Sequence, residues 1–352
     1  MFESLQVSDC PSFKTALGLK GRSFLSTEEL SWDDWQQLFA LAKATKERGP
    51  SLLGQPLQGK SIALVFFNPS LRTRVSMSVA IHQLGGQPVA LEIGKGTWDL
   101  EHLCGVKMDG TKSEHVKEAL PVLSQYVDGI AVRCFPAQKD FATDARDEVL
   151  KAFAQYAQVP VFNMESAFWH PMQALADMLT IYEIKGGFKR RKVVLSWANH
   201  PKALPHAVPN SFALASAQCG CDLWIVAPEG YALDQRVVEK CQAFATSMGG
   251  TVVVTSNREE AYRDADIIYA KSWASHRDYG YPERENRAAL QDWIITDEVM
   301  QKTCDGRLMH CLPVRRNVVV ADSVLDGPRS AVVQQAGNRL HMQRALLASV
   351  WG

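Results

Sequence analysis

The chain has 352 residues, 46% of them hydrophobic and 22% charged, and its formal net charge at pH 7 is zero. A chain of this length and composition can bury the cores of two ordinary domains. The balanced charge argues against a basic nucleic-acid surface and against an acidic solvating tail. No apolar run approaches the roughly 18 residues of a membrane span.

Cysteine usage and the first residues indicate the cellular compartment. The eight cysteines are scattered without a C-x-x-C pair, and the N-terminus carries neither a basic region nor an apolar core. A thiol redox motif would show a C-x-x-C pair, a disulfide framework would show regularly spaced cysteines, and a signal peptide would show a basic region before an apolar core. We therefore expect a reduced, cytoplasmic protein that binds neither nucleic acid nor membranes.

Strands and helices alternate along most of the chain. Ser31 and Asp34 have the spacing of a capping box, which predicts a helix that runs toward Gly49. The strands predicted next are 61–65, 88–93, 129–135 and 159–163, with helices over 75–84, 114–126 and 145–156. A second series has strands 192–197, 223–227, 251–255, 267–270, 308–312 and 331–333, and helices 171–184, 208–217, 234–248 and 338–350.

This alternation is typical of parallel sheets covered by helices. It predicts an α/β protein with two doubly wound parallel-sheet domains. We place them at 1–159 and 160–337, with the C-terminal helix 338–352 completing the first.

The turn between the first of these strands and its helix carries two arginines and two hydroxyl groups. Residues 66–74 read Phe-Phe-Asn-Pro-Ser-Leu-Arg-Thr-Arg. A helix begins with unpaired N–H groups at the positive end of its dipole, where arginines are disfavoured. The alternative is a solvated helix face, but the cost of Arg72 and Arg74 at this end favours a bound anion, most naturally phosphate. The chain lacks G-x-x-x-x-G-K-[ST], and no G-x-G-x-x-G follows a strand, so the usual nucleotide signals are missing.

Three more polar groups lie at the carboxyl ends of predicted strands or just beyond them. They are Arg133, then Glu165 with the His170–Gln173 segment, and His310–Pro313. A single histidine after a strand is more often structural than catalytic. Ligands of α/β proteins bind at the carboxyl ends of strands, so four polar groups at predicted strand ends indicate a binding site.

Three motifs in the same order resemble the aspartate/ornithine carbamoyltransferase superfamily over nearly the full chain. They are Ser-Leu-Arg-Thr-Arg at 70–74, His-Pro-Met-Gln at 170–173 and His-Cys-Leu-Pro at 310–313. The last motif resembles the ornithine side of the superfamily. The surroundings of the motifs are similar to those in the N-acylornithine carbamoyltransferases, which use acetyl- or succinyl-ornithine. The similar positions are 66–68, Trp98 in its glycine-flanked loop, 108–110, 163–165, 269–273 and 311–317. The S-M-G loop of ornithine carbamoyltransferases is absent, which makes that activity a secondary alternative.

The resemblance implies which residues bind carbamoyl phosphate. The implied set is Ser70, Leu71, Arg72, Thr73, Arg74, Trp98, Arg133, His170, Gln173, Cys311, Leu312 and Arg339. Arginine forks suit a phosphate dianion. Among these residues, Arg133, His170 and Thr73 would direct donors at the carbonyl oxygen, where negative charge grows. Gln173 would orient the carbamoyl amide. The nucleophile is the substrate's neutral amine, so Cys311 is not expected to act as a nucleophile, and no metal ion or cofactor is expected.

The second substrate is implied to contact Ser113, Glu165, His200, Lys271, Cys311, Leu312 and Arg315. By resemblance, Trp98 reaches in from a neighbouring subunit, which implies a homotrimer with shared sites. The alternative for Trp98 is an ordinary buried aromatic, but Gly94, Gly96 and nearby charges favour a surface loop.

The identity of the acyl group depends on the loop around Ser113. Acetyl-type members carry glutamate at the position of Ser113, and a carboxylate there would repel a succinyl group. The longer spacing from Glu165 to His170 also matches the succinyl type, and Val319 replaces a lysine of some acetyl-type members. Lys112 and Arg315 are candidate partners for the succinyl carboxylate. Alternatively, Ser113 is only the N-cap of the helix predicted over 114–126.

The resulting hypothesis is transfer of the carbamoyl group to N-succinyl-L-ornithine, giving N-succinyl-L-citrulline and phosphate in arginine biosynthesis. N-acetyl-L-ornithine is the alternative substrate. A non-catalytic anion-binding regulatory subunit is a further alternative, which the three intact motifs disfavour.

Overall fold

The computed structural model describes residues 18–281 and 287–352, and these form two compact units. Unit 1 contains the described residues up to Phe135, together with Asp147–Ser166 and Arg339–Gly352. Unit 2 contains Pro136–Arg146 and the described residues from Ala167 to Asn338. The chain therefore passes between the units more than once. Residues 136–146 belong to unit 2, and residues 147–166 and 339–352 return to unit 1, whereas the predicted boundaries lay at 159/160 and 337/338.

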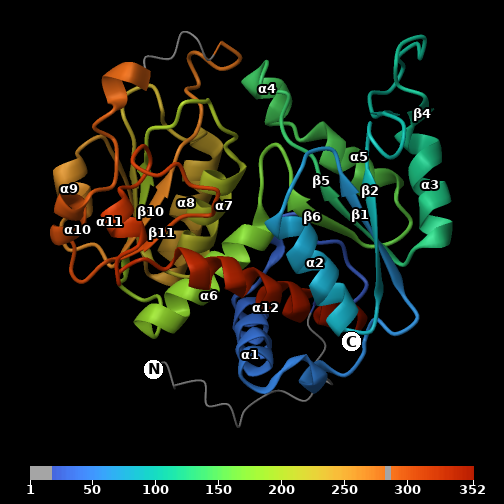
Figure 1. Cartoon of the computed structure of the whole chain (residues 1–352), viewed down its shortest axis with the longest axis horizontal. Helices are drawn as coiled ribbons and strands as arrows, with labels where there is room; N and C mark the ends of the chain where they lie inside the picture. Colours follow the sequence, from blue (N-terminus) through green and yellow to red (C-terminus); the bar gives the residue numbers. More distant parts are fainter. Residues whose placement is uncertain (1–17, 282–286) are drawn as a thin grey trace. The chain divides into compact units, whose positions relative to one another are not determined.

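Unit 1 is built on a four-stranded parallel sheet in the order β2-β1-β5-β6 (Figure 1). The strands are β1 (Ser61–Phe66), β2 (Gln87–Glu92), β5 (Gly129–Arg133) and β6 (Val161–Glu165). Its helices are α1 (Trp32–Arg48), α2 (Arg72–Gln83), α3 (Val116–Tyr126) and α5 (Glu148–Tyr156), with the short 3-10 turns η2 (Thr27–Glu29) and η3 (Pro50–Leu53). Two short strands, β3 (Leu100–Glu101) and β4 (Glu114–His115), pair in parallel outside this sheet.

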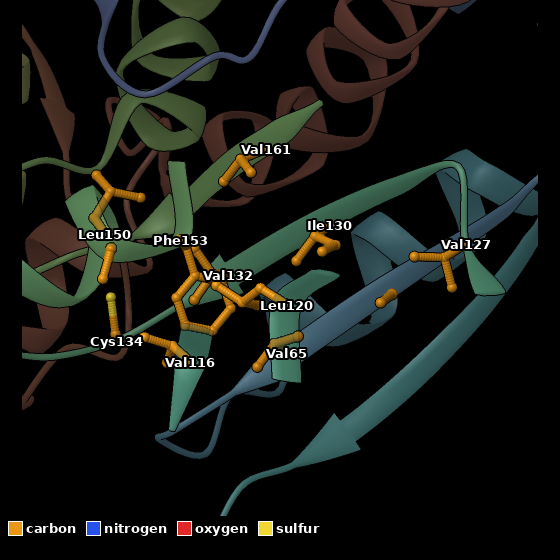
Figure 2. Packing of buried hydrophobic residues seen from close by; sticks show 12 residues of the cluster. Val65, Val116, Leu120, Val127, Ile130, Val132, Cys134, Leu150, Phe153 and Val161 are labelled. Atoms are coloured by element: carbon orange, nitrogen blue, oxygen red, sulfur yellow. The ribbon is translucent and has the colours of Figure 1, made fainter. Parts of the chain in front are cut away.

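The core of unit 1 lies where helices α3 and α5 meet the strands. Figure 2 shows this cluster, in which side chains of α3, α5 and the central strands converge with Phe153 among them. Phe153 is fully buried, and its ring lies edge-on to Phe67 at 6.0 Å. Strands buried on both faces need continuous apolar runs, and for this reason β1 and β5 were recognisable in the sequence.

Unit 2 contains a five-stranded parallel sheet in the order β11-β10-β7-β8-β9 (Figure 1). The strands are β7 (Lys192–Trp197), β8 (Asp222–Val226), β9 (Thr251–Thr255), β10 (Ile267–Lys271) and β11 (Arg307–Met309). The long helices are α6 (Pro171–Lys185), α7 (Ala207–Gln218) and α8 (Gln235–Met248). Shorter elements are α4 (Phe141–Asp144), α9 (Arg258–Tyr262), α10 (Asp297–Gln301), α11 (Asp322–Leu325) and η5 (Arg287–Leu290).

The last helix, α12 (Val332–Trp351), contributes residues to both units. Its end packs in unit 1, where the Trp351 ring lies 5.4 Å from the Phe162 ring. A Cβ at Gly129 would lie 2.8 Å from the Trp351 ring, so the close approach of this tryptophan requires glycine there. Among the described residues, no helix is both long enough and apolar enough to span a membrane.

The two parallel sheets confirm the predicted fold class, and most predicted elements are present within a few residues. The capping box of Ser31 and Asp34 is formed. The strand predicted at 331–333 is wrong, because these residues lead into the first turn of α12. The helix predicted over 114–126 begins only at Val116, and its N-cap is His115, whose ring accepts the Lys117 N–H. Ser113 is therefore not a helix cap.

Replacing Phe153 by alanine should destabilise the protein by about 3–5 kcal/mol, because the change leaves a cavity in a fully buried cluster. Urea unfolding followed by circular dichroism measures this difference. Tyr126→Ala is the control, since that side chain is 72% exposed and should change stability by less than about 0.5 kcal/mol. Equal effects of the two variants would contradict the placement of Phe153 in the core.

Candidate active site

The turn from β1 into α2 places hydroxyl groups at the start of the helix in unit 1. The Ser70 hydroxyl accepts the Thr73 N–H at 3.2 Å, so it satisfies one of the first-turn donors. Thr73 is buried, and its hydroxyl oxygen accepts from Nη2 of Arg339, itself buried on α12, at 2.7 Å. The Leu71 side chain is 75% exposed. The helix begins at Arg72, so both arginines of the motif lie in its first turn.

Arg74 has a partner that the sequence did not indicate. Its guanidinium forms an ion pair with Glu92 at the end of β2 and lies 4.8 Å from the centre of the Phe66 ring. The argument that both arginines need an external anion therefore does not hold for Arg74. Both partners are partly exposed, and such pairs contribute little stability.

A buried ion pair joins the ends of β5 and β6. Arg133 and Glu165 face each other where a register shift interrupts the pairing of the two strands, and both side chains are about 10% exposed. The Arg133 guanidinium also lies 4.4 Å from the centre of the Phe135 ring. The Phe135 N–H donates to the Asn68 side chain at 2.7 Å. This contact ties the turn before α2 to the end of β5.

The loop between β2 and α3 contains Trp98 and Ser113. Trp98 is 58% exposed, and its indole N–H donates to Glu114 at 2.7 Å, which agrees with the surface loop expected and not with a buried aromatic. Ser113 is exposed. Lys112, a candidate partner for an acyl carboxylate, instead pairs with Glu101 at 3.1 Å.

Glu101 is the anchor of this loop. Burial raises its pKa, but the Leu103 N–H, the Lys112 ammonium and the His102 N–H oppose that effect and lower the pKa to about 2. The carboxylate is therefore charged at neutral pH and can hold Lys112 and the backbone of 102–103.

In unit 2, His170 and Gln173 stand at the start of α6. The His170 N–H donates to Ser211 at 2.7 Å, and Gln173 donates its side-chain NH2 to Asp177 at 2.7 Å. The side chain of Gln335 also donates to Asp177, at 2.7 Å. These side chains are all buried.

The His-Cys-Leu-Pro segment follows β11 and has an unusual backbone. Leu312 has a φ of 55°, in the left-handed region that non-glycine residues seldom adopt. Its N–H donates to Nδ1 of His310 at 2.8 Å. Burial raises the pKa of Tyr269 well above its usual range, and nearby Asp177 and Cys311 raise it further. Strained backbone such as that of Leu312 is concentrated at functional sites.

Positive charge surrounds His200 in unit 2. Burial lowers the pKa of its ring; the backbone of Lys202 opposes this, while the charges of Lys271, Arg315 and Arg287 lower it further. The His200 carbonyl also accepts from Arg287 at 3.1 Å. A pocket of about 440 Å³ is lined by Asn199, His200, Pro201, Arg287, Ala288, Gln291, Asn317 and Val318. The site is suited to an anionic group.

Each unit contains part of the predicted set. In unit 1 these residues are Ser70, Leu71, Arg72, Thr73, Arg74, Trp98, Ser113, Arg133, Glu165 and Arg339. In unit 2 they are His170, Gln173, His200, Lys271, Cys311, Leu312 and Arg315. Sequence reasoning missed Glu92, Asp177, Arg287 and Gln335. Only Asp177 carried a local signal, because it lies one helical turn after Gln173.

Comparisons with known proteins place the chain in a family. Residues 22–183 match the carbamoyl-P binding domain of aspartate/ornithine carbamoyltransferases, and residues 206–350 match their Asp/Orn binding domain. The N-acetylornithine carbamoyltransferase of Xanthomonas campestris pv. campestris is 41% identical, over 94% of this chain and 98% of that protein. The chain belongs to the aspartate/ornithine carbamoyltransferase family.

Other members of this family show the same similarity. The N-succinylornithine carbamoyltransferase of Bacteroides thetaiotaomicron is 42% identical over 80% of this chain and 84% of that protein. A solved variant of N-acetyl-L-ornithine transcarbamylase, complexed with carbamyl phosphate and N-succinyl-L-norvaline, superposes with a TM-score of 0.90. It has 41% identity over 94% of this chain and 99% of that chain. Like its family, this chain is a carbamoyltransferase enzyme.

Replacing Arg72 by alanine should weaken carbamoyl phosphate binding by one to two orders of magnitude. The change would remove the expected charge-assisted contact between Arg72 and the phosphate, worth about 1.5–3 kcal/mol. Calorimetric titration with carbamoyl phosphate measures the loss, and Arg48→Ala, at an exposed position of α1, is the matched control. Binding of wild-type strength in Arg72→Ala would exclude this phosphate site.

Proposed function

We propose that the protein transfers the carbamoyl group of carbamoyl phosphate to the side-chain amine of an N-acyl-L-ornithine. The observation that carries this proposal is the start of α2, where Thr73 is held by Arg339 beside two arginines and the Ser70 hydroxyl. Such a helix start is suited to a phosphate dianion. The similarity to enzymes named for N-acetylornithine and N-succinylornithine supports the choice of second substrate. The product would be an N-acylcitrulline, used in arginine biosynthesis.

In the proposed reaction the amine nitrogen attacks the carbonyl carbon of carbamoyl phosphate. A new C–N bond forms, the C–O bond to phosphate breaks, and the departing phosphate takes the proton that the amine loses. Arg133, His170 and Thr73 would stabilise the negative charge that grows on the carbonyl oxygen. No side chain needs to act as a nucleophile, so catalysis depends on orientation and electrostatics.

The residues proposed for this chemistry come from both units. The proposed phosphate ligands and Arg133 belong to unit 1, whereas His170, Gln173 and the cations around His200 belong to unit 2. In unit 2, Lys271 would bind the α-carboxylate of the acyl amino acid, and Arg287 and Arg315 belong to the same positive group. A direct test is release of phosphate from carbamoyl phosphate that depends on an added acylornithine. Failure to release phosphate would favour the non-catalytic alternative.

We further propose N-succinyl-L-ornithine as the preferred substrate. Ser113 is exposed and does not cap α3, so the alternative explanation of Ser113 as a helix N-cap is excluded. This leaves its proposed role in the loop over the acyl group. A small neutral side chain leaves room for a second carboxylate and does not repel its charge. Because Lys112 is already paired with Glu101, exposed Arg315 becomes the stronger candidate partner for that carboxylate. N-acetyl-L-ornithine is the alternative substrate.

Wild-type protein should have a higher kcat/KM for N-succinyl-L-ornithine than for N-acetyl-L-ornithine. Ser113→Glu should lower this ratio about fivefold or more, because two like charges at about 4 Å repel by about 1 kcal/mol even in water. Ser113→Gln has nearly the same size without the charge and should change the ratio little. A wild-type preference for the acetyl substrate would refute the assignment, and equal effects of Glu and Gln would assign the change to size.

We also propose a homotrimer in which Trp98 enters the site of a neighbouring subunit. The exposed indole, held by Glu114, is consistent with a side chain presented to a partner. Mixing Trp98→Ala with Arg72→Ala subunits should restore part of the activity, because a mixed interface can contain one site with neither lesion. Each variant reassembled alone is the control. Full activity in a species that sediments as a monomer would contradict the proposal.

A further inference from the structure

Two side-chain amides converge on one buried carboxylate in unit 2. Nε2 of Gln173 and Nε2 of Gln335 both lie 2.7 Å from Oδ1 of Asp177. The three side chains are at most 2% exposed. Nothing in the proposed reaction uses Asp177 directly, and a buried carboxylate is costly unless its hydrogen bonds are satisfied. Its two amide contacts therefore indicate what it does.

The carboxylate fixes which end of the Gln173 amide points away from it. An ionised carboxylate can only accept hydrogen bonds, whereas a glutamine amide has a donor end and an acceptor end. The NH2 of Gln173 must therefore face Asp177, and the carbonyl oxygen is the end presented elsewhere. A carbonyl oxygen can accept a hydrogen bond from an amino group but not from a methyl group.

The second amide extends the same control to the His-Cys-Leu-Pro segment. Because Gln335 donates its NH2 to Asp177, its oxygen is turned to the backbone and accepts the His310 N–H at 2.9 Å. The His310 ring in turn accepts the Leu312 N–H at 2.8 Å. One carboxylate thus orients a side chain of the His-Pro-Met-Gln motif and the backbone of the His-Cys-Leu-Pro motif.

We propose that Asp177 is a positioning residue that turns the Gln173 oxygen toward the amino group of carbamoyl phosphate. The enzyme then distinguishes this substrate from acetyl phosphate, in which a methyl group replaces the amino group. This inference rests on the proposed function, because it assigns the carbamoyl amide to Gln173. Asp177 itself would contact no substrate atom, and it would affect this discrimination through Gln173.

The test compares the KM for carbamoyl phosphate with the inhibition constant of acetyl phosphate. Asp177→Ala and Gln173→Leu should each lower the preference for carbamoyl phosphate about three- to tenfold, which is the worth of one hydrogen bond. The inhibition constant of acetyl phosphate should hardly change. The double variant should lose no more preference than Gln173→Leu. A general packing defect would weaken both ligands alike, and an unchanged preference in folded Asp177→Ala would overturn the inference.

Two further variants keep the test decisive. Asp177→Asn still offers an oxygen to both amides and should retain the preference within about threefold, even if Asp177→Ala does not fold. A preference as low as that of Gln173→Leu would overturn the acceptor role. Thr180 lies on α6 like Asp177, and its buried hydroxyl accepts a hydrogen bond from Asn338 on α12. Thr180→Val removes that hydroxyl and should leave the preference unchanged. Failure of the wild-type protein to carbamoylate any acylornithine would refute the proposed function, whereas the variants test only Asp177.

Discussion

The buried pair of Arg133 and Glu165 is the constraint on which the strand ends of unit 1 depend. Both side chains are about 10% exposed. Either charge without its partner would destabilise the fold by several kcal/mol. The register shift between β5 and β6 brings the two side chains opposite each other. The Arg133 carbonyl accepts the Phe67 N–H at 3.0 Å, and Asn68 binds the next segment of chain. The turn that opens α2 is therefore built on the backbone of this arginine.

Unit 2 uses a carboxylate in a different way. Glu165 neutralises a cation, whereas Asp177 accepts hydrogen bonds from two neutral amides, which disperse its charge. Charge-assisted hydrogen bonds are stronger than neutral ones and hold their donors in one orientation. The first arrangement fixes where a guanidinium lies, and the second fixes which end of an amide is presented. Both place polar groups on rigid elements, with Arg133 at a strand end and Gln173 in the first turn of a helix.

Local sequence patterns predicted the sheets but not these pairings. Continuous apolar runs gave the strands because parallel strands are buried on both faces. The strand predicted at 331–333 is wrong because β-branched residues also begin α12, where tertiary packing overrides local preference. Arg74 with Glu92, Arg133 with Glu165 and Gln335 with Asp177 are 18, 32 and 158 residues apart, so no periodicity reveals them. The placement of β6 in unit 1 and of 136–146 in unit 2 is likewise a long-range outcome, which the predicted boundary at 159/160 did not capture.

The cations around His200 serve the proposed reaction in two ways. They would attract the carboxylate of an acylated amino acid, and they also disfavour any further positive charge nearby. Burial is the main cause of the lowered pKa of His200, and the charges of Lys271, Arg315 and Arg287 lower it further. The attacking amine must lose a proton before it can react, and a positive surrounding favours its neutral form for the same reason. An acyl group on the α-nitrogen removes the only other ammonium of ornithine, so the acylated substrate brings less positive charge into this site. The electrostatics of unit 2 therefore suit an N-acylornithine better than free ornithine, on grounds independent of the similarity to known enzymes.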